Sequence, residues 1–174
     1  RSKAYITFSG IKLQKAFSTI FYAGDHSNTG FILRNLEVTK CKGFTSNMLY
    51  IRKSVDCIVE NNYLHDNVNE RGIVVIDAEN AIVKNNTIEK QGASTIVFMN
   101  VNKGQIIGNI ISDSLGIHGN GITAAYLGSH DILVANNIVT NSNILITLGS
   151  PSYNVTIYNN ILHGKDNSSL LLAN

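Results

Sequence analysis

A short phrase centred on asparagine recurs through the whole sequence and restricts the folds that are open to it. The equivalent positions are Ile11, Leu36, Asn62, Asn86, Asn109, Asn137 and Asn160, at separations of 25, 26, 24, 23, 28 and 23 residues. A period in this range indicates a solenoid. Each period carries two short β-branched runs bounded by Asn and Gly, a pattern typical of strands and turns, and apolar residues at helical spacing are absent. We therefore predict an all-β, right-handed, single-stranded parallel β-helix of about seven coils.

The repeated asparagine has a structural explanation. A sharp turn between strands requires a residue with φ > 0, a conformation that Asn tolerates better than other residues except glycine. Stacked about 4.8 Å apart, the side-chain amides can also hydrogen-bond from coil to coil. Leu36 and Ile11 replace Asn in the first coils. We therefore expect an Asn ladder at this turn that begins at Asn62 and serves structure, not catalysis.

Length and composition exclude several classes of protein. The 174 residues suffice for one domain with a substantial core, so we treat 1–174 as a single β-helix domain. The net charge of +2 comes without a run of Lys or Arg, which argues against a nucleic-acid partner. No apolar stretch approaches the roughly 20 residues that would cross a membrane. No acidic cluster matches a metal site, and we expect no cofactor.

Two further features concern the redox state and the ends of the chain. Cys41 and Cys57 could form a disulfide or remain as two free thiols, and the sequence leaves both possibilities open. A solenoid needs polar caps to prevent end-to-end pairing, and neither end carries an evident capping helix. We therefore expect the chain to be part of a larger protein.

An apolar column, meaning one position repeated on successive coils, is predicted on the outer surface. Alternation along the strands points Ile32, Ile58, Ile82, Ile106 and Leu133 outward. An exposed apolar strip over several coils is unusual on a monomer. It has two interpretations: β-branched residues suit flat stacked sheets, or the column packs against a second copy or a neighbouring domain.

The phrases Asn85-Asn86-Thr87-Ile88, Asn136-Asn137-Ile138 and Asn159-Asn160-Ile161 resemble the coil repeat of the pectate-lyase-like superfamily of parallel β-helix proteins. The resemblance covers almost the whole chain. It implies an extracellular or cell-surface protein that acts on or binds a polysaccharide. The catalytic signatures of the superfamily are missing: the segment 116–121 only loosely echoes a Gly-His-Gly motif, and the chain has no Trp.

Polar residues just after the Asn turn form the best candidate site, because enzymes of this architecture bind sugar chains along one outer sheet. One column alternates in charge through Lys40, Asp66, Lys90 and Asp113. This is either a surface salt-bridge ladder or a catalytic groove. In the groove, Asp66 and Asp113 lie about 9.6 Å apart, near the upper limit for an inverting carboxylate pair. Lys90 neutralises a uronate or acts as a base.

The neighbouring column and two loops supply the remaining candidates. His65 and Glu89 are predicted to bind substrate beside the charged column. Arg71 could hold a sugar carboxylate with two hydrogen bonds, or form a surface ion pair. The longest coil contains the excursion 115–121, where His118 with Asn120 could bind a sugar or assist acid–base chemistry, or form only a glycine-rich turn.

Together these features favour a carbohydrate-active β-helix that binds an extracellular polysaccharide and, if it is catalytic, cleaves it as a lyase or a glycoside hydrolase. The alternative is a non-catalytic structural or adhesive solenoid.

Overall fold

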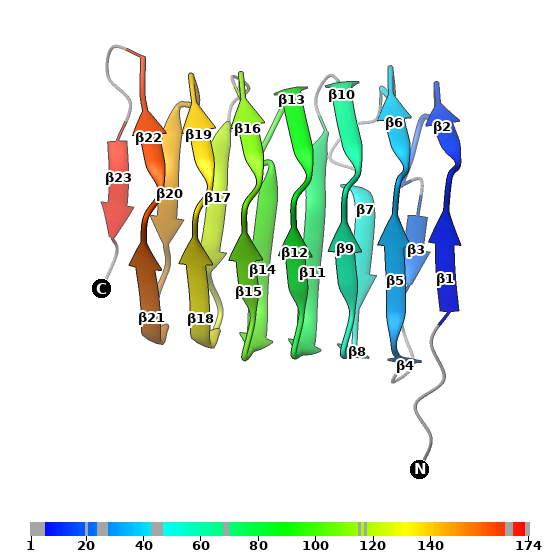
Figure 1. Ribbon diagram of the computed structural model, residues 1–174. Helices are drawn as coiled ribbons and strands as arrows, with labels where there is room; N and C mark the ends of the chain where they lie inside the picture. The colour runs from blue at the N-terminus through cyan, green and yellow to red at the C-terminus, as the bar shows by residue number, and fades with distance from the viewer. Residues whose placement is uncertain are drawn as a thin grey trace.

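The chain folds as a flattened coil of parallel strands wound around one axis (Figure 1). The computed structural model describes residues 6–19, 21–23, 28–42, 47–67, 70–114, 116, 118–165 and 169–172, none of which is helical. In Figure 1 two rows of short strands form the front of the coil and one row of strands forms the back. Each strand pairs in parallel with its equivalent on the next coil.

The strands fall into three rows. The lower front row is β1 (Ile6–Ser9), β5 (Phe31–Arg34), β9 (Ile58–Glu60), β12 (Ile82–Lys84), β15 (Gln105–Ile107), β18 (His130–Ala135) and β21 (Tyr153–Tyr158). The upper front row is β2 (Lys12–Gln14), β6 (Glu37–Thr39), β10 (Tyr63–Asn67), β13 (Thr87–Gln91), β16 (Ile110–Ser112), β19 (Ile138–Thr140) and β22 (Ile161–His163). The back row is β3 (Phe21–Ala23), β7 (Asn47–Arg52), β11 (Arg71–Glu79), β14 (Ile96–Asn102), β17 (Asn120–Ala125), β20 (Ile144–Leu148) and β23 (Ser169–Leu172). The short strands β4 (Asn28–Thr29) and β8 (Ser54–Val55) lie at the lower edge.

The predicted fold is confirmed, with a small correction to the number of coils. The upper front row is a separate sheet of seven strands, and the lower and back rows join into a sheet of sixteen strands. Seven strands in a row are connected by about six turns of the chain, slightly fewer than the seven coils expected.

The predicted Asn ladder runs through the interior behind the bend between the two front rows. Asn62, Asn86, Asn109 and Asn137 are buried. The Oδ1 atom of each accepts a hydrogen bond from the backbone N–H of the ladder residue on the preceding coil, at 2.9–3.0 Å for the pairs from Leu36–Asn62 to Asn137–Asn160. Each Nδ2 also donates to a backbone carbonyl inside the coil, as Asn109 does to Val83 at 3.0 Å. The ladder begins at Asn62, as predicted.

The turn itself is made by a different residue from the one expected. The positive φ falls on the position before the ladder, at Asn35, Asn61, Asn85, Gly108, Asn136 and Asn159. The second residue of each Asn-Asn pair points inward and bonds along the axis, whereas the first adopts the left-handed conformation and lies at the surface. Turn formation and hydrogen bonding between coils are therefore performed by two adjacent residues, whereas the sequence analysis assigned both to the ladder asparagine.

The core fills the space between the front and back rows. Phe98 on β14 is fully buried and faces the start of β15, where Gly104 makes room for its ring. A Cβ atom on Gly104 would lie 2.6 Å from Cε2 of Phe98 and 3.0 Å from Cδ1 of Ile132. The absence of a side chain at Gly104 therefore leaves the core volume that the ring of Phe98 fills from the back row.

The outward apolar column is confirmed except at one coil. Ile32, Ile58, Ile82 and Leu133 stand in register and are half-buried. The prediction for Ile106 is wrong, because Ile106 pairs with the inward Val83 and is buried. The outward position on that coil is Gln105, four residues before Asn109, as Ile82 is four before Asn86. Since Gln105 is polar, the apolar column is interrupted.

Candidate functional site

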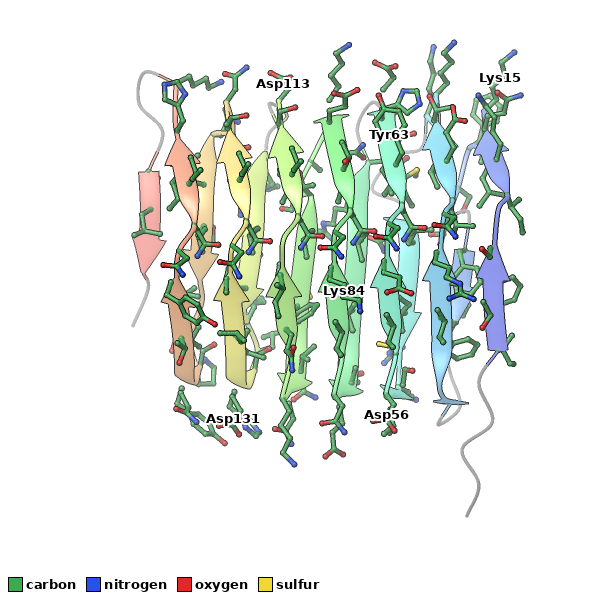
Figure 2. The ribbon with its side chains drawn as sticks, viewed as in Figure 1. Lys15, Asp56, Tyr63, Lys84, Asp113 and Asp131 are labelled. Carbon is green, nitrogen blue, oxygen red and sulfur yellow. The ribbon has the colours of Figure 1, made fainter. Side chains whose placement is uncertain are left out.

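The charged column of the sequence analysis lies at a corner of the coil. Asp66, Lys90 and Asp113 all have positive φ, of 55°, 52° and 58°. Figure 2 shows Lys15 and Asp113 of this corner at the upper edge and Asp56 and Asp131 of another corner at the lower edge. That lower corner comprises Asp56, Asn80, Lys103, Asp131 and Asn154, also with positive φ. Alternation of Lys, Asp and Asn is thus a property of the corners in general, and the charged column by itself does not mark a site.

A distinct feature beside this corner is a pair of stacked rings on β10. The ring centroids of Tyr63 and His65 lie 4.3 Å apart with an interplanar angle of 19°. The two residues alternate with the buried Leu64, so both face outward from the seven-stranded sheet. Tyr63 remains 39% exposed. The pair therefore presents an aromatic ring with a polar tip on the molecular surface.

Charged groups from the adjoining coils surround this pair. The imidazole Nε2 of His65 lies 3.3 Å from Oε1 of Glu37, and its Nδ1 lies 2.9 Å from Oδ2 of Asp66. Lys12 donates to Glu37 at 2.6 Å, and Lys90 lies 3.5 Å from Asp66. The hydroxyl of Tyr63 donates to Glu89. We call these seven residues the polar cluster: Lys12, Glu37, Tyr63, His65, Asp66, Glu89 and Lys90.

The contacts in the polar cluster shift the pKa values of three of its groups. The hydrogen bond from Lys12, reinforced by His65, lowers the pKa of Glu37. The hydrogen bond from His65, reinforced by Lys90, lowers the pKa of Asp66. The hydrogen bond that Tyr63 donates to Glu89 raises the pKa of its phenol to about 12. At neutral pH the two carboxylates are therefore acceptors and the phenol is a donor.

Four of the eight candidate site residues belong to the polar cluster: His65, Asp66, Glu89 and Lys90. Asp113 lies two coils beyond Asp66 in the corner, where Asn141 donates to its Oδ1. The partners of Asp66 are His65 and Lys90, whereas Asp113 accepts from Asn141, so the two carboxylates have different partners. The low pKa of Asp66 suits a base or a hydrogen-bond acceptor and does not suit a general acid, which must carry a proton.

The remaining candidates lie at the turns into the back row. Arg71 begins β11 and is half-buried, and Asn120 begins β17, where its Nδ2 donates to Thr123 at 3.3 Å. His118 is exposed, and its carbonyl accepts a hydrogen bond from Ser94 at 2.9 Å. Leu115 and Ile117 of the same excursion lie outside the described residues. None of these three residues has a contact with the polar cluster among those that the structure describes.

Sequence analysis did not single out Lys12, Glu37 and Tyr63 as partners of His65. They occupy one column, in which Lys12 pairs with Glu37 and Glu37 with Tyr63 across neighbouring strands. Counting one residue forward from each ladder position, at Ile11, Leu36 and Asn62, would have aligned them. The repeat gives this alignment, but the contacts of Lys12 and Glu37 depend on side-chain rotamers that the repeat does not define.

Other kinds of site find no support in the described part of the chain. No group of three His, Cys, Asp or Glu residues there could hold a metal ion. Among the same residues there is also no helix long and apolar enough for a membrane span. Cys41 and Cys57 are both free and buried, and burial raises the pKa of Cys57 to about 12.

Comparison with solved structures finds proteins of similar architecture at low similarity. One is PfbA, a surface adhesin of Streptococcus pneumoniae, with 11% identity and a TM-score of 0.47 over 98% of this chain and 62% of that one. Another is a mutant DFA-IIIase from Arthrobacter chlorophenolicus A6 in complex with DFA-III, with 14% identity and a TM-score of 0.45 over 95% of this chain and 57% of that one. The chain thus spans about three fifths of each protein's length.

Similarity at this level carries no information about activity. No curated protein matches the sequence. The family described as "Right handed beta helix region" matches residues 47–174, which is most of the chain and every coil from β7 onward. With the parallel coils and the internal ladder already described, this match shows that the chain belongs to the right-handed β-helix family.

Proposed function

We propose that the protein binds a neutral polysaccharide at the polar cluster, in an extracellular or cell-surface setting. The observation that carries this proposal is the exposed Tyr63 ring, stacked on His65 and bordered by carboxylates. The apolar C–H face of a pyranose packs on an aromatic ring, and its hydroxyls donate to carboxylate oxygens. Glu37, Asp66 and Glu89 offer such acceptors on three adjoining coils.

The charges of the polar cluster favour a neutral sugar over a uronate. The acidic side chains of the cluster outnumber its lysines, three carboxylates against two ammonium groups. A polyuronate would meet this excess of carboxylates unfavourably. Lys90, which could neutralise a uronate, already lies beside Asp66.

Binding without cleavage is the form of this function that the cluster supports best. Hydrolysis of a glycosidic bond needs one carboxyl that stays protonated, and the contacts of Glu37 and Asp66 hold both of them ionised. Catalysis through Asp66, Lys90, Asp113 or His118 remains a separate proposal. It requires a sugar that bridges the upper corner of at least three coils.

A second candidate function is that of an adhesive or structural solenoid. The observation in its favour is the outward surface of the last coils, where Ile110 is 49% and Ile161 is 61% exposed. These residues stand in the same column as Tyr63. In this alternative the apolar positions contact a protein partner and the polar cluster is only a charged surface.

Affinity electrophoresis through gels that contain xylan, mannan, mixed-linkage glucan or polygalacturonate tests the first proposal. We expect at least one neutral polysaccharide to retard the protein and polygalacturonate to leave its mobility unchanged. Tyr63→Ala should abolish the retardation. Tyr158→Ala is the matched control, because Tyr158 is similarly exposed at 47% and faces outward far from the cluster.

Two results would contradict the proposal. Unchanged mobility of the wild-type protein in all gels would remove the support for carbohydrate binding and favour the adhesive solenoid. Equal retardation of Tyr63→Ala and wild type would place binding elsewhere. Release of reducing ends or of unsaturated uronate, lost in Asp66→Asn or Lys90→Ala, would show cleavage and overturn the restriction to binding.

A further inference from the structure

The arrangement of tyrosine, histidine and aspartate in the polar cluster occurs a second time at the opposite edge of the front face. His130 begins β18 and Tyr153 begins β21 on the next coil, where the two residues pair across the strands. Their ring centroids lie 4.7 Å apart with an interplanar angle of 5°. Figure 2 shows Asp131 beyond the lower edge of the ribbon, far from Tyr63 near the upper edge.

The histidine–aspartate hydrogen bond is the same at the two places. Nδ1 of His130 lies 2.9 Å from Oδ2 of Asp131, the same distance as between His65 and Asp66. Both aspartates have positive φ, of 56° and 55°. The second carboxylate oxygen of Asp131 accepts from Asn154 on the next coil. The hydrogen bond from His130 is the main reason why the pKa of Asp131 is lowered, as that from His65 is for Asp66.

We infer that Tyr153, His130, Asp131 and Asn154 form a second site for a neutral saccharide, so that the chain binds one polysaccharide at two places. Tyr153 is 61% exposed, more than Tyr63, and offers the larger ring surface. The fixed carboxylate of Asp131 accepts from sugar hydroxyls, and Asn154 provides an amide beside it. The ligand class rests on the proposed function, because the second site shares the stacked Tyr–His pair and the His–Asp hydrogen bond of the first.

The spacing of the two sites determines what a long ligand gains from both. The upper-row partner of His65 on the coil of His130 is Thr140, three strands along the axis, or about 14 Å. Thr140 and His130 are ten residues apart, at most about 33 Å along the strands. An oligosaccharide much shorter than this distance occupies the sites independently. A polymer that reaches both gains a factor of up to roughly 10²–10⁴ in affinity.

Titration of the ¹⁵N-labelled protein with xylotetraose, mannotetraose and cellotetraose, followed by NMR, tests this inference. We expect one tetrasaccharide to shift two separate sets of backbone amides, around residues 63–66 and around 130–131 with 153–154. Tyr153→Ala should erase the second set and leave the first unchanged, and Tyr63→Ala should do the reverse. The parent polymer should bind wild type at least tenfold more tightly than either variant does. Tyr158→Ala should behave as wild type.

The outcomes separate this inference from the proposal on which it rests. Shifts confined to residues near Tyr63 would overturn the second site and leave the proposed function intact. Shifts confined to the surroundings of Tyr153 would contradict the polar cluster and support the second place alone. An absence of shifts with all three tetrasaccharides would overturn both.

Discussion

The two halves of the front face share one backbone but differ in two outward columns, those of Lys84 and of Tyr63. In the first coils the outward positions hold charged networks, such as Lys84, which lies 3.1 Å from Glu60. In the later coils the same columns hold apolar residues: Ile107 follows Lys84, and Ile110 follows Thr87. We call these the charged half, from β2 to β13, and the apolar half, from β15 to β22. Strand register and turn conformation continue unchanged from one half to the other.

This contrast shows which positions of a coil are fixed by the fold. The ladder asparagines, the inward residues and the corner residues are constrained by burial or by positive φ, so they recur in both halves. Outward positions are constrained by neither, and they diverge. Information about function therefore resides in the outward columns, where a change of residue leaves the coil intact.

The largest effect is expected where the two halves meet, at Asn109. Asn109→Ala removes the acceptor for the N–H and Nδ2 groups of Asn86, each at 3.0 Å, inside a buried ladder. Because two buried donors of Asn86 are then left without an acceptor, we expect the free energy of unfolding to fall by about 2–4 kcal/mol. Urea unfolding measures it. The control is Asn85→Gly, at a surface position with φ of 54°, which should stay within about 0.5 kcal/mol of wild type. Equal losses of stability in the two variants would mean that the buried hydrogen bonds between Asn86 and Asn109 stabilise the protein no more than the surface turn does.

The next effect concerns the core that lies behind both halves. Gly104→Ala places a methyl group 2.6 Å from the ring of Phe98 and should destabilise the protein by about 1–3 kcal/mol. Phe98→Leu is also destabilising alone, but in the double variant it should recover part of the loss because the smaller side chain leaves room. A double-mutant cycle by urea unfolding measures this coupling. If the losses of stability in the two single variants add exactly in the double variant, Gly104 and Phe98 do not compete for the same space in the core.

The sequence predicted the constrained positions well and the functional ones only in part. The Asn period predicted the β-helix and the start of the ladder at Asn62, because hydrogen bonding to the next coil requires the same residue at each turn. It misplaced Ile106 because Asn109 follows Asn86 by 23 residues, whereas Asn86 follows Asn62 by 24. A constant step of 24 residues from Ile82 therefore reaches Ile106 instead of Gln105. The polar cluster could be predicted only from His65 onward. Its contacts with Glu37 and Tyr63 depend on rotamers and on the register of the weaker first coils.

The contrast between the halves can be sharpened by transferring the site. Ile110 and Ser112 are in register with Tyr63 and His65, and Asp113 already occupies the corner that Asp66 occupies two coils earlier. The double substitution Ile110→Tyr with Ser112→His should build a second stacked pair in the apolar half. We expect about a twofold increase in the number of tetrasaccharides bound at the upper edge, measured by NMR titration. Ile110→Tyr alone is the control, and a full gain from it would mean that the histidine is dispensable.

The smallest effect is expected from acid, which should weaken the contacts of Glu37 and Asp66 in the charged half. The pKa values of Glu37 and Asp66 are lowered in the folded protein by hydrogen bonds from Lys12 and His65 respectively. Their stabilising contribution is therefore complete above the ordinary carboxyl pKa and is lost as the pH falls through the lower, folded-state pKa. Between about pH 5 and about pH 2.5, the Tm of wild type should fall more steeply than that of Glu37→Gln. Ile138→Gln, in the same column of the apolar half, should retain the wild-type slope. Identical slopes for wild type and Glu37→Gln would mean that water screens these contacts completely.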